Sequence, residues 1–207
     1  MSTFVIPPEL LESLNTSAEG LKSAAKTFTP DPLIPGKYSQ ITSIVSSAQK
    51  RHGILIEQAI LARLKQSPDL KIWTEPEFNV SAPAEALISS YLSNPELAKN
   101  SDIPYQKSND NRVRSMQIDL IAYDKSKESI ISYEIKRGNG MHDSKSKASM
   151  LKNLVCQQTL LKSYGEQKGF KISNADSKVI FYYGKCSLSK EYSLTKADLD
   201  AHFDFSL

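Results

Sequence analysis

The sequence predicts an α/β domain, and three features of the chain support that prediction. Residues 116–123 and 130–136 are rich in β-branched and aromatic side chains and alternate with period two, which is typical of strands. Residues 142–164 place apolar side chains at helical spacing, and residues 178–184 form an apolar run typical of a buried strand. Strands and helices that alternate in this way predict a sheet covered by helices.

The two period-two segments are expected to pair as an antiparallel hairpin. The polar loop Lys125–Glu128 between them sets Asp124 opposite Ser129. Counting back from that pair places Asp119 opposite Glu134, and the same register aligns the apolar faces of the two strands.

Strict alternation then decides which side chains share a face. On the first strand it puts Ile118 on one face and both Asp119 and Ile121 on the other. On the second strand it puts Lys136 on the same face as Glu134. An acid, a second acid and a lysine therefore converge on one face of the predicted hairpin.

This convergence favours a metal site. Directly opposed side chains in an antiparallel pair have Cβ atoms ~5 Å apart, and like charges there are destabilising. Lys136 supplies part of the compensating charge, but a divalent ion with oxygen ligands fits Asp119 and Glu134 better. A solvated strand face carries the same residue types and stays open as the alternative. The break at Arg137–Gly140 lets a backbone or a ligand come close.

Upstream, residues 46–66 are predicted to be helical, with a possible break at Gly53, and residues 71–80 are predicted to form the first strand. Pro76 places that strand at a sheet edge or at a bulge. Glu57 is an acid within the apolar stripe of the helix, either paired at its edge or pointing into a site. Glu75 and Glu77 on the strand compete with Glu57 as a third carboxylate and rank below it.

The segment between the first and second strands, residues 81–111, is too long for a simple connection. It begins with a short predicted helix, residues 84–92, and continues with polar residues and prolines. It is either a substrate-contacting element or a surface insertion. Arg112 and Arg114 follow it just before Asp119, where they can reach phosphates.

The predicted helix at 142–164 is basic on the side away from its apolar stripe, and Asp143 or Ser144 caps its start. A basic helix beside a metal site suits binding to a phosphate backbone, although charge runs are usually solvated faces. Residues 195–203 are expected to form a short capped C-terminal helix. The candidate nucleic-acid contacts are Arg112, Arg114, Arg137, Lys145, Lys147 and Gln158.

Length and composition limit the class of protein that this chain can be. The 207 residues, 40% of them hydrophobic, can bury one sizeable core, and the net charge of +3 permits nucleic-acid binding without requiring it. The sequence has no apolar run long enough to cross a membrane and no signal-peptide pattern, so we expect no membrane partner. Cys156 and Cys186 lack metal-ligand spacing and are expected to be ordinary thiols, which favours a cytoplasmic protein. Residues 1–40 are expected to form a helical extension before a domain at 41–207, packing on its core or contributing to a dimer interface.

Asp119 followed by Glu134-Ile135-Lys136, a basic helix and another apolar strand resembles the PD-(D/E)xK nuclease superfamily. The resemblance covers residues 49–184, about two thirds of the chain. Ile118 stands where the family name has proline, a position that the family keeps loosely. The resemblance implies a restriction-endonuclease-like core, with a mixed central sheet in αβββαβ order flanked by helices.

The same resemblance implies a Mg²⁺-dependent endodeoxyribonuclease, most similar to type II restriction enzymes, in which Mn²⁺ can substitute. Asp119, Glu134 and the backbone carbonyl of Ile135 would ligate the metal, which lowers the pKa of bound water. Lys136 would orient that water or stabilise the charged phosphorus centre, and Glu57 would be a further carboxylate.

Double-stranded DNA is the partner that this interpretation implies, with a homodimer that cuts both strands or a protein partner that recruits the chain. A repair or junction-resolving nuclease and the nuclease subunit of a larger defence or transposition complex remain open. So does a non-catalytic nucleic-acid-binding protein on the same fold, or an unrelated α/β domain.

Overall fold

The computed structural model describes residues 6–94, 96–99, 101, 103–107, 112–205 and 207. The chain divides into two compact units, Met1–Ala62 and Arg63–Leu207. The sequence suggested a boundary at residue 40, but helix α2 (Gly36–Leu64) runs through that point and through Gly53 without interruption. The proline-rich bend therefore separates two helices, α1 (Pro8–Lys26) and α2, rather than two domains.

The larger unit is built on a five-stranded mixed sheet in the spatial order β1-β2-β3-β4-β5. The β1–β2 and β2–β3 pairs are antiparallel, whereas β3–β4 and β4–β5 are parallel. The expectation of an α/β domain with a mixed sheet is confirmed. The strands are β1 (Leu70–Ser81), β2 (Arg112–Asp124), β3 (Ser129–Lys136), β4 (Asn174–Phe181) and β5 (Ser193–Thr195).

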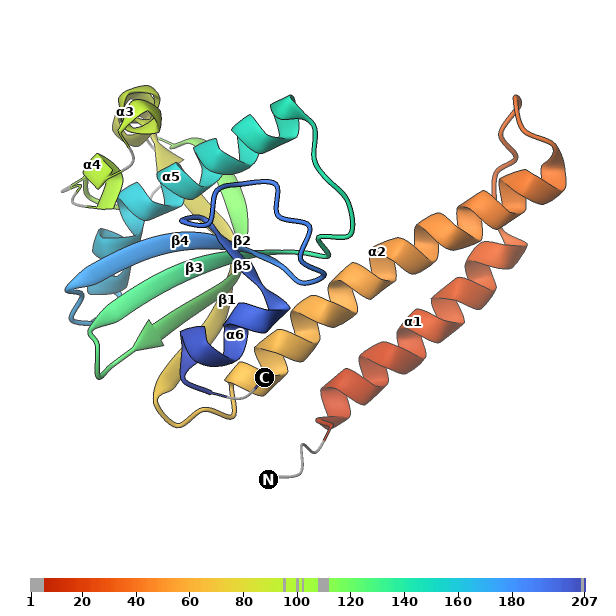
Figure 1. Cartoon of the computed structure of the whole chain (residues 1–207), viewed down its shortest axis with the longest axis horizontal. Coiled ribbons are helices and arrows are strands. Elements are labelled where there is room, and N and C mark those ends of the chain that lie inside the picture. Colours follow the sequence, from red (N-terminus) through yellow and green to blue (C-terminus); the bar gives the residue numbers. More distant parts are fainter. Residues whose placement is uncertain (1–5, 95, 100, 102, 108–111, 206) are drawn as a thin grey trace. The chain divides into compact units, whose positions relative to one another are not determined.

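Helices cover both faces of this sheet (Figure 1). The Ser132 hydroxyl bonds to Gln157 of α5, whereas the hydroxyl of the next residue, Tyr133, bonds to His202 of α6, so the two helices lie on opposite faces. Among the described helices, none is both long and apolar enough to span a membrane. The helices of this unit are α3 (Ala82–Ser93), α4 (Glu96–Lys99), α5 (Ser144–Gln167) and α6 (Lys196–Phe203).

The hairpin between β2 and β3 has the predicted register. Asp124 pairs with Ser129, and the ladder continues without a shift to Leu120 opposite Tyr133. The four residues of the loop, 125–128, form the turn between the strands. Loop length therefore set the register, as the sequence indicated.

The strict alternation expected along the first hairpin strand is wrong at Asp119. Trp73 of β1 pairs with Ile121 but Glu75 pairs with Ile118, so Asp119 and Leu120 together face a single residue of β1. This β-bulge shifts the phase of β2, and Ile118 and Ile121 both enter the core beneath α5.

β1 shows both features that its proline predicted. It is an edge strand of the sheet, and its pairing with β2 shifts register between Glu75 and Phe78, the interval that contains Pro76.

The described part of the 81–111 insertion packs on the core. α3 and α4 contact α5, and the ring of Tyr105 packs against both Phe78 and Tyr164, which also contact each other. The Tyr105 hydroxyl accepts a hydrogen bond from the Asn79 amide at 3.2 Å. The described residues of the insertion are thus ordered parts of the core and not a loose surface insertion, one of the two alternatives from the sequence.

Capping residues begin α5 and α6. Asp143 accepts a hydrogen bond from the Ser146 amide at 2.8 Å at the start of α5, as expected. Thr195 and Asp198 form a capping box that begins α6. β4 begins earlier than the expected 178–184. It also ends earlier, because the chain enters a turn directly after Phe181.

Gly138 is required where the chain leaves β3. Its φ is +65°, and a Cβ at this position would lie 2.7 Å from the Cβ of Phe181. The close approach allows the Lys185 amide to donate to the Gly138 carbonyl oxygen at 2.8 Å. The glycine-rich break after β3 thus lets one backbone pass against another, as predicted.

We expect Gly138→Ala to lower the free energy of unfolding by about 2–4 kcal/mol, through left-handed strain together with overpacking against Phe181. Urea denaturation would measure the loss. Gly169→Ala is the matched control, because Gly169 has a φ of +83° but no described atom within 4 Å of the place that its new methyl group would take, so only strain of about 1 kcal/mol applies. Equal losses in the two variants would show that the contact with Phe181 does not matter.

Candidate functional site

The structure brings Asp119, Glu134 and Lys136 together at the point where β2 and β3 stop pairing. The Asp119 carboxylate accepts a hydrogen bond from the Ile135 amide at 2.9 Å. The Lys136 ammonium lies 2.6 Å from a carboxylate oxygen of Glu134. The regular ladder between the strands ends at Leu120, so the Asp119 side chain takes the place that a backbone carbonyl of β2 would have in a regular sheet.

Asp119 is held in an environment that disfavours its charge. Burial raises the pKa of Asp119, and the neighbouring Glu134 carboxylate raises it as well. The hydrogen bond from Ile135 and the charge of Lys136 act in the opposite direction but do not cancel the rise in this pKa. A cation placed between the two carboxylates would relieve both the repulsion and part of the desolvation cost.

The donor set suits a hard divalent ion that keeps much of its water. Among the residues that the structure describes, no group of three or more His, Cys, Asp and Glu side chains is placed to hold a metal. Mg²⁺ commonly takes one or two carboxylates and completes its coordination with water and substrate oxygens. Asp119 and Glu134 fit that pattern, and they would not fit a closed structural site.

The other acids considered from the sequence are occupied elsewhere or lie in the other unit. Glu75 accepts a hydrogen bond from the Tyr164 hydroxyl at 2.6 Å, and exposed Glu77 forms an ion pair with Arg112. Glu57 lies on α2 in the N-terminal unit and is half-buried. Its role as a third carboxylate stays a prediction.

On α5, the glutamine that reaches the hairpin is Gln157. Its side-chain oxygen accepts a hydrogen bond from Ser132, two residues before Glu134 on the same face of β3, and its amide nitrogen lies 3.5 Å from the sulfur of Met116. Gln158, which was expected to contact nucleic acid, is instead 1% exposed and donates to Asp176. Both glutamines therefore bond to residues of the sheet, Gln157 to β3 and Gln158 to β4.

Two of the expected phosphate contacts, Arg112 and Arg114, are already neutralised. Arg114 donates to Glu85 of α3 at 3.1 Å and to Asn153 of α5 at 3.0 Å. Lys152 also pairs with Glu85. Burial alone would raise the pKa of Glu85, but hydrogen bonds from Lys152 and Arg114 outweigh it and lower that pKa.

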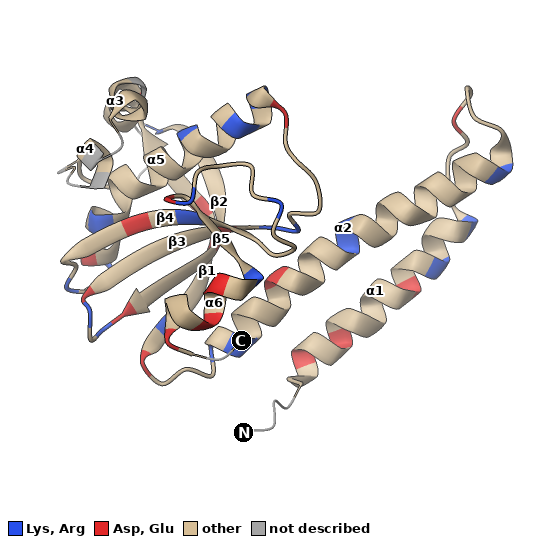
Figure 2. Ribbon diagram, viewed as in Figure 1, with Lys and Arg blue, Asp and Glu red and all other residues tan. Residues whose placement is uncertain are grey.

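The basic residues at the start of α5 are more accessible. Lys145 is exposed and Lys147 is half-exposed, and Figure 2 shows the basic bands on this half of the helix. Arg137, directly after the candidate acid-x-lysine, is half-buried. In the chain, Arg137 directly follows the end of β3 and the two lysines lie in the first turn of α5.

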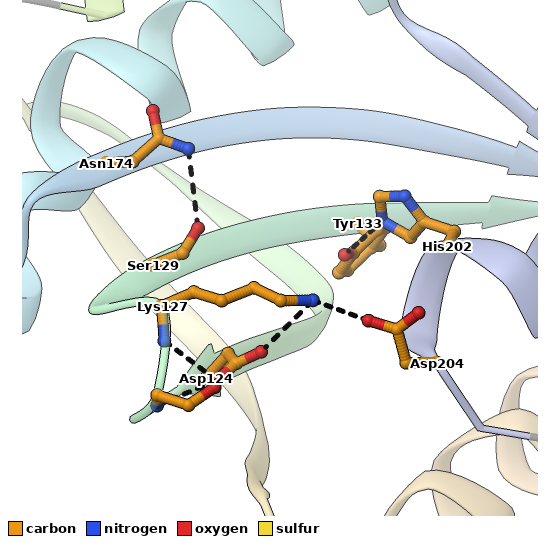
Figure 3. A network of polar contacts seen from close by, with 8 residues as sticks. Asp124, Lys127, Ser129, Tyr133, Asn174, His202 and Asp204 are labelled. Atoms are coloured by element: carbon orange, nitrogen blue, oxygen red, sulfur yellow. Dashed lines mark hydrogen bonds and ion pairs between the residues drawn. The ribbon is translucent and has the colours of Figure 1, made fainter.

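A second polar cluster, on the α6 face of the sheet, had no signal in the sequence. The Tyr133 hydroxyl and the His202 ring are 2.8 Å apart, and Lys127 bridges Asp124 and Asp204 at 3.5 and 2.7 Å (Figure 3). Burial lowers the pKa of His202, and the charge of Lys178 lowers it further. A neutral imidazole paired with a buried phenol anchors α6 against the sheet.

No protein-family model, curated protein or solved structure matches the chain.

Asp119→Asn is expected to stabilise the metal-free protein at neutral pH. The folded-state pKa of Asp119 is raised, so its ionised form costs stability above that pKa, and the cost disappears as the pH falls below the ordinary aspartate pKa of about 4. Urea denaturation between acidic and neutral pH measures the free energy of unfolding. The variant should have the higher value at pH 7, and the difference from the wild type should disappear in acid.

The matched control is Asp143→Asn, whose effect has the opposite sign. The hydrogen bond from the Ser146 amide lowers the pKa of Asp143, so this carboxylate favours folding at neutral pH and loses that effect in acid. A neutral-pH loss for Asp119→Asn that resembles the loss for Asp143→Asn would contradict the environment described for Asp119.

Proposed function

We propose that this protein is a metal-dependent phosphodiesterase, and most specifically a Mg²⁺-dependent endodeoxyribonuclease. The observation that carries the proposal is the meeting of Asp119, Glu134 and Lys136 where the pairing of β2 with β3 ends, with a raised pKa at Asp119. A carboxylate pair beside an ammonium group supplies the parts needed for metal-assisted hydrolysis of a phosphodiester.

Each residue has a distinct task in this proposal. Asp119 and Glu134 would hold Mg²⁺, or Mn²⁺ in its place, and the backbone carbonyl of Ile135 would be a further ligand. The bound ion lowers the pKa of a coordinated water and neutralises charge on the phosphate. Lys136, now paired with Glu134 at 2.6 Å, would orient the attacking water or stabilise the charge that develops on the phosphate.

Double-stranded DNA is the proposed substrate in a restriction-type reaction. Lys145 and Lys147 lie exposed or half-exposed at the start of α5, where they can contact backbone phosphates. A homodimer with one site in each subunit would cut both strands. A repair nuclease, or the nuclease subunit of a larger complex, would use the same residues.

A second candidate is a non-catalytic nucleic-acid-binding protein of the same architecture. The observation that favours it is the pair of carboxylates in the sheet unit, to which no described His, Cys, Asp or Glu adds a third ligand. Such a protein would bind nucleic acid through the basic surface of α5 without hydrolysing it.

Cleavage is tested with supercoiled plasmid and phage DNA in Mg²⁺, with EDTA, and with Lys136→Ala. We expect discrete products that disappear with EDTA and fall at least 100-fold with the variant, in line with the roughly 3–4 kcal/mol that a single preorganised group supplies. Lys125→Ala, in the exposed turn of the same hairpin, is the control and should cut normally. Equal activity of the two variants would exclude this site.

Metal binding has a readout that is independent of cleavage. Mg²⁺ at 100 times its Kd should stabilise the wild-type protein by about 2.7 kcal/mol, and Asp119→Asn should abolish the effect. Thermal unfolding with and without Mg²⁺ measures it. Stabilisation without cleavage would favour the binding protein or a nuclease that requires a partner, and no stabilisation would count against a metal at Asp119.

Glu85→Gln should strengthen non-specific DNA binding. Removal of the carboxylate releases Arg114 and Lys152 for phosphates, and the slope of log affinity against log salt should steepen by about one to two. Fluorescence anisotropy across a salt series measures the slope. Glu166→Gln, an exposed acid on α5 with the same charge change, should leave it nearly unchanged.

A further inference from the structure

Two loops run side by side at the end of the sheet where Lys136 lies. The loop after β4 is bonded to the end of β3, because the Tyr182 amide donates to the Lys136 carbonyl oxygen at 3.0 Å. The next amide, that of Tyr183, donates to the Arg137 carbonyl oxygen at 2.7 Å. These bonds hold the residues that follow β4 directly beside the lysine of the candidate site.

Tyr183 presents an aromatic side chain to solvent at this place. The sequence predicted a buried strand over residues 178–184, but β4 ends at Phe181 and the chain turns through the two tyrosines that follow. Gly184, with a φ of +82°, completes the turn, and its amide donates to the Phe181 carbonyl oxygen at 2.9 Å. Tyr183 is consequently 49% exposed, so a ligand can reach its side chain.

Tyr182 packs against Tyr183 and is held in turn by a lysine. The centroids of the two tyrosine rings are 5.3 Å apart, and the ring planes meet edge to face at 83°. The ammonium group of Lys196, the first residue of α6, lies 5.5 Å from the centroid of the Tyr182 ring. The exposed ring thus rests on a second ring that has a cation beside it.

The two loops carry positive charge. Residues 135–142 and residues 179–189 contain no Asp or Glu. A surface with this charge attracts the phosphates of a nucleic acid. The basic residues of the two segments are Lys136, Arg137 and Lys185.

The acids that come directly before and after the first of these loops already have partners. Glu134 pairs with Lys136 at 2.6 Å, and Asp143 accepts a hydrogen bond from the Ser146 amide at the start of α5. On α6, Asp198 is bonded to the amide and hydroxyl of Thr195 in the capping box. Each of these carboxylates is therefore engaged in a local contact.

An exposed aromatic ring among basic residues has the chemistry of a site for unpaired nucleotides. Aromatic side chains stack on the faces of bases in single strands, and Lys and Arg neutralise the phosphates between those bases. In a blunt duplex the faces of the internal bases are already stacked on one another, so such a ring finds no partner there. The combination at Tyr183 favours a single strand.

We propose that Tyr183 stacks on an unpaired base of a nucleic-acid strand whose phosphates contact the basic residues of the two loops. The inference rests on the proposed function in taking nucleic acid as the ligand, and it adds an unpaired segment to the proposed substrate. Stacking requires neither a metal ion nor cleavage. The two proposals can therefore fail separately.

Binding of a fluorescent oligothymidylate in EDTA, followed by anisotropy, tests the contribution of the ring. Tyr183→Ala should weaken binding about 5-fold or more, the low end of what one base stacked on an aromatic ring contributes. Tyr38→Ala is the matched control, because Tyr38 is 52% exposed, has the Lys37 ammonium 4.9 Å from its ring centroid and lies in the N-terminal unit. Equal affinities of the two variants would overturn the proposal.

Tryptophan fluorescence tests the contact itself and does not depend on whether Tyr183→Ala folds. Tyr183→Trp keeps a stacking ring, so it should bind the oligothymidylate like the wild type, and its emission should be quenched on binding. Tyr38→Trp should not be quenched, and Trp73, the one native tryptophan, contributes the same background to both variants. Binding without quenching of Tyr183→Trp would overturn the stacking contact.

Two further ligands distinguish an unpaired strand from other sources of the same chemistry. Tyr183→Ala should bind a blunt DNA duplex as the wild type does, and equal weakening for duplex and single strand would overturn base stacking. Thymidine monophosphate should not displace the oligothymidylate at equal nucleotide concentration. Displacement would assign the ring to a free nucleotide and overturn the strand.

The cleavage and Mg²⁺ assays separate this inference from the proposed function. Single-strand binding that depends on Tyr183, with no cleavage of any DNA, would support this inference and count against the nuclease. Cleavage and Mg²⁺ stabilisation together with single-strand binding that ignores Tyr183 would support the nuclease and overturn this inference.

Discussion

The hydrogen bond from the Ile135 amide to the Asp119 carboxylate is the contact on which the candidate site depends. It can form because a β-bulge in β2 brings Asp119 toward the strand that would otherwise pair through its backbone. The same contact ends the regular ladder, buries the carboxylate and holds it beside Glu134. Asp119 thus both ends the strand pairing and carries a buried charge. A bound cation would offset the free-energy cost of burying that charge.

The hairpin shows which parts of this arrangement a sequence can specify. A four-residue loop fixes the register, so the approach of Asp119 to Glu134 followed from counting residues. The bulge did not follow, because no glycine or proline marks it in β2 and both phases of the strand place apolar residues in the core. Gln157 and Gln158 are both buried and bond to different strands, Gln157 to Ser132 of β3 and Gln158 to Asp176 of β4. Only tertiary packing decides these two partners.

Side-chain pairs between residues far apart in the chain could not be predicted from the sequence. Tyr133 and His202 are a core strand residue and a terminal helix residue, and nothing in their local patterns joins them. The ion pairs of Glu85 with Arg114 and Lys152 connect the insertion to β2 and α5 in the same way. They show that an acid of the insertion pairs with basic side chains of β2 and α5, a role that its polar composition did not indicate.

The two edges of the sheet have a consequence for how copies of this chain can meet. β1 carries a proline and irregular pairing, and β5 is only three residues long. Neither edge offers a continuous row of backbone donors and acceptors to which another strand could add. These features disfavour the addition of a neighbouring molecule's strand to either edge, so we expect specific assembly to use side-chain contacts. Contacts of that kind can be changed one residue at a time without disturbing the strands that carry the site.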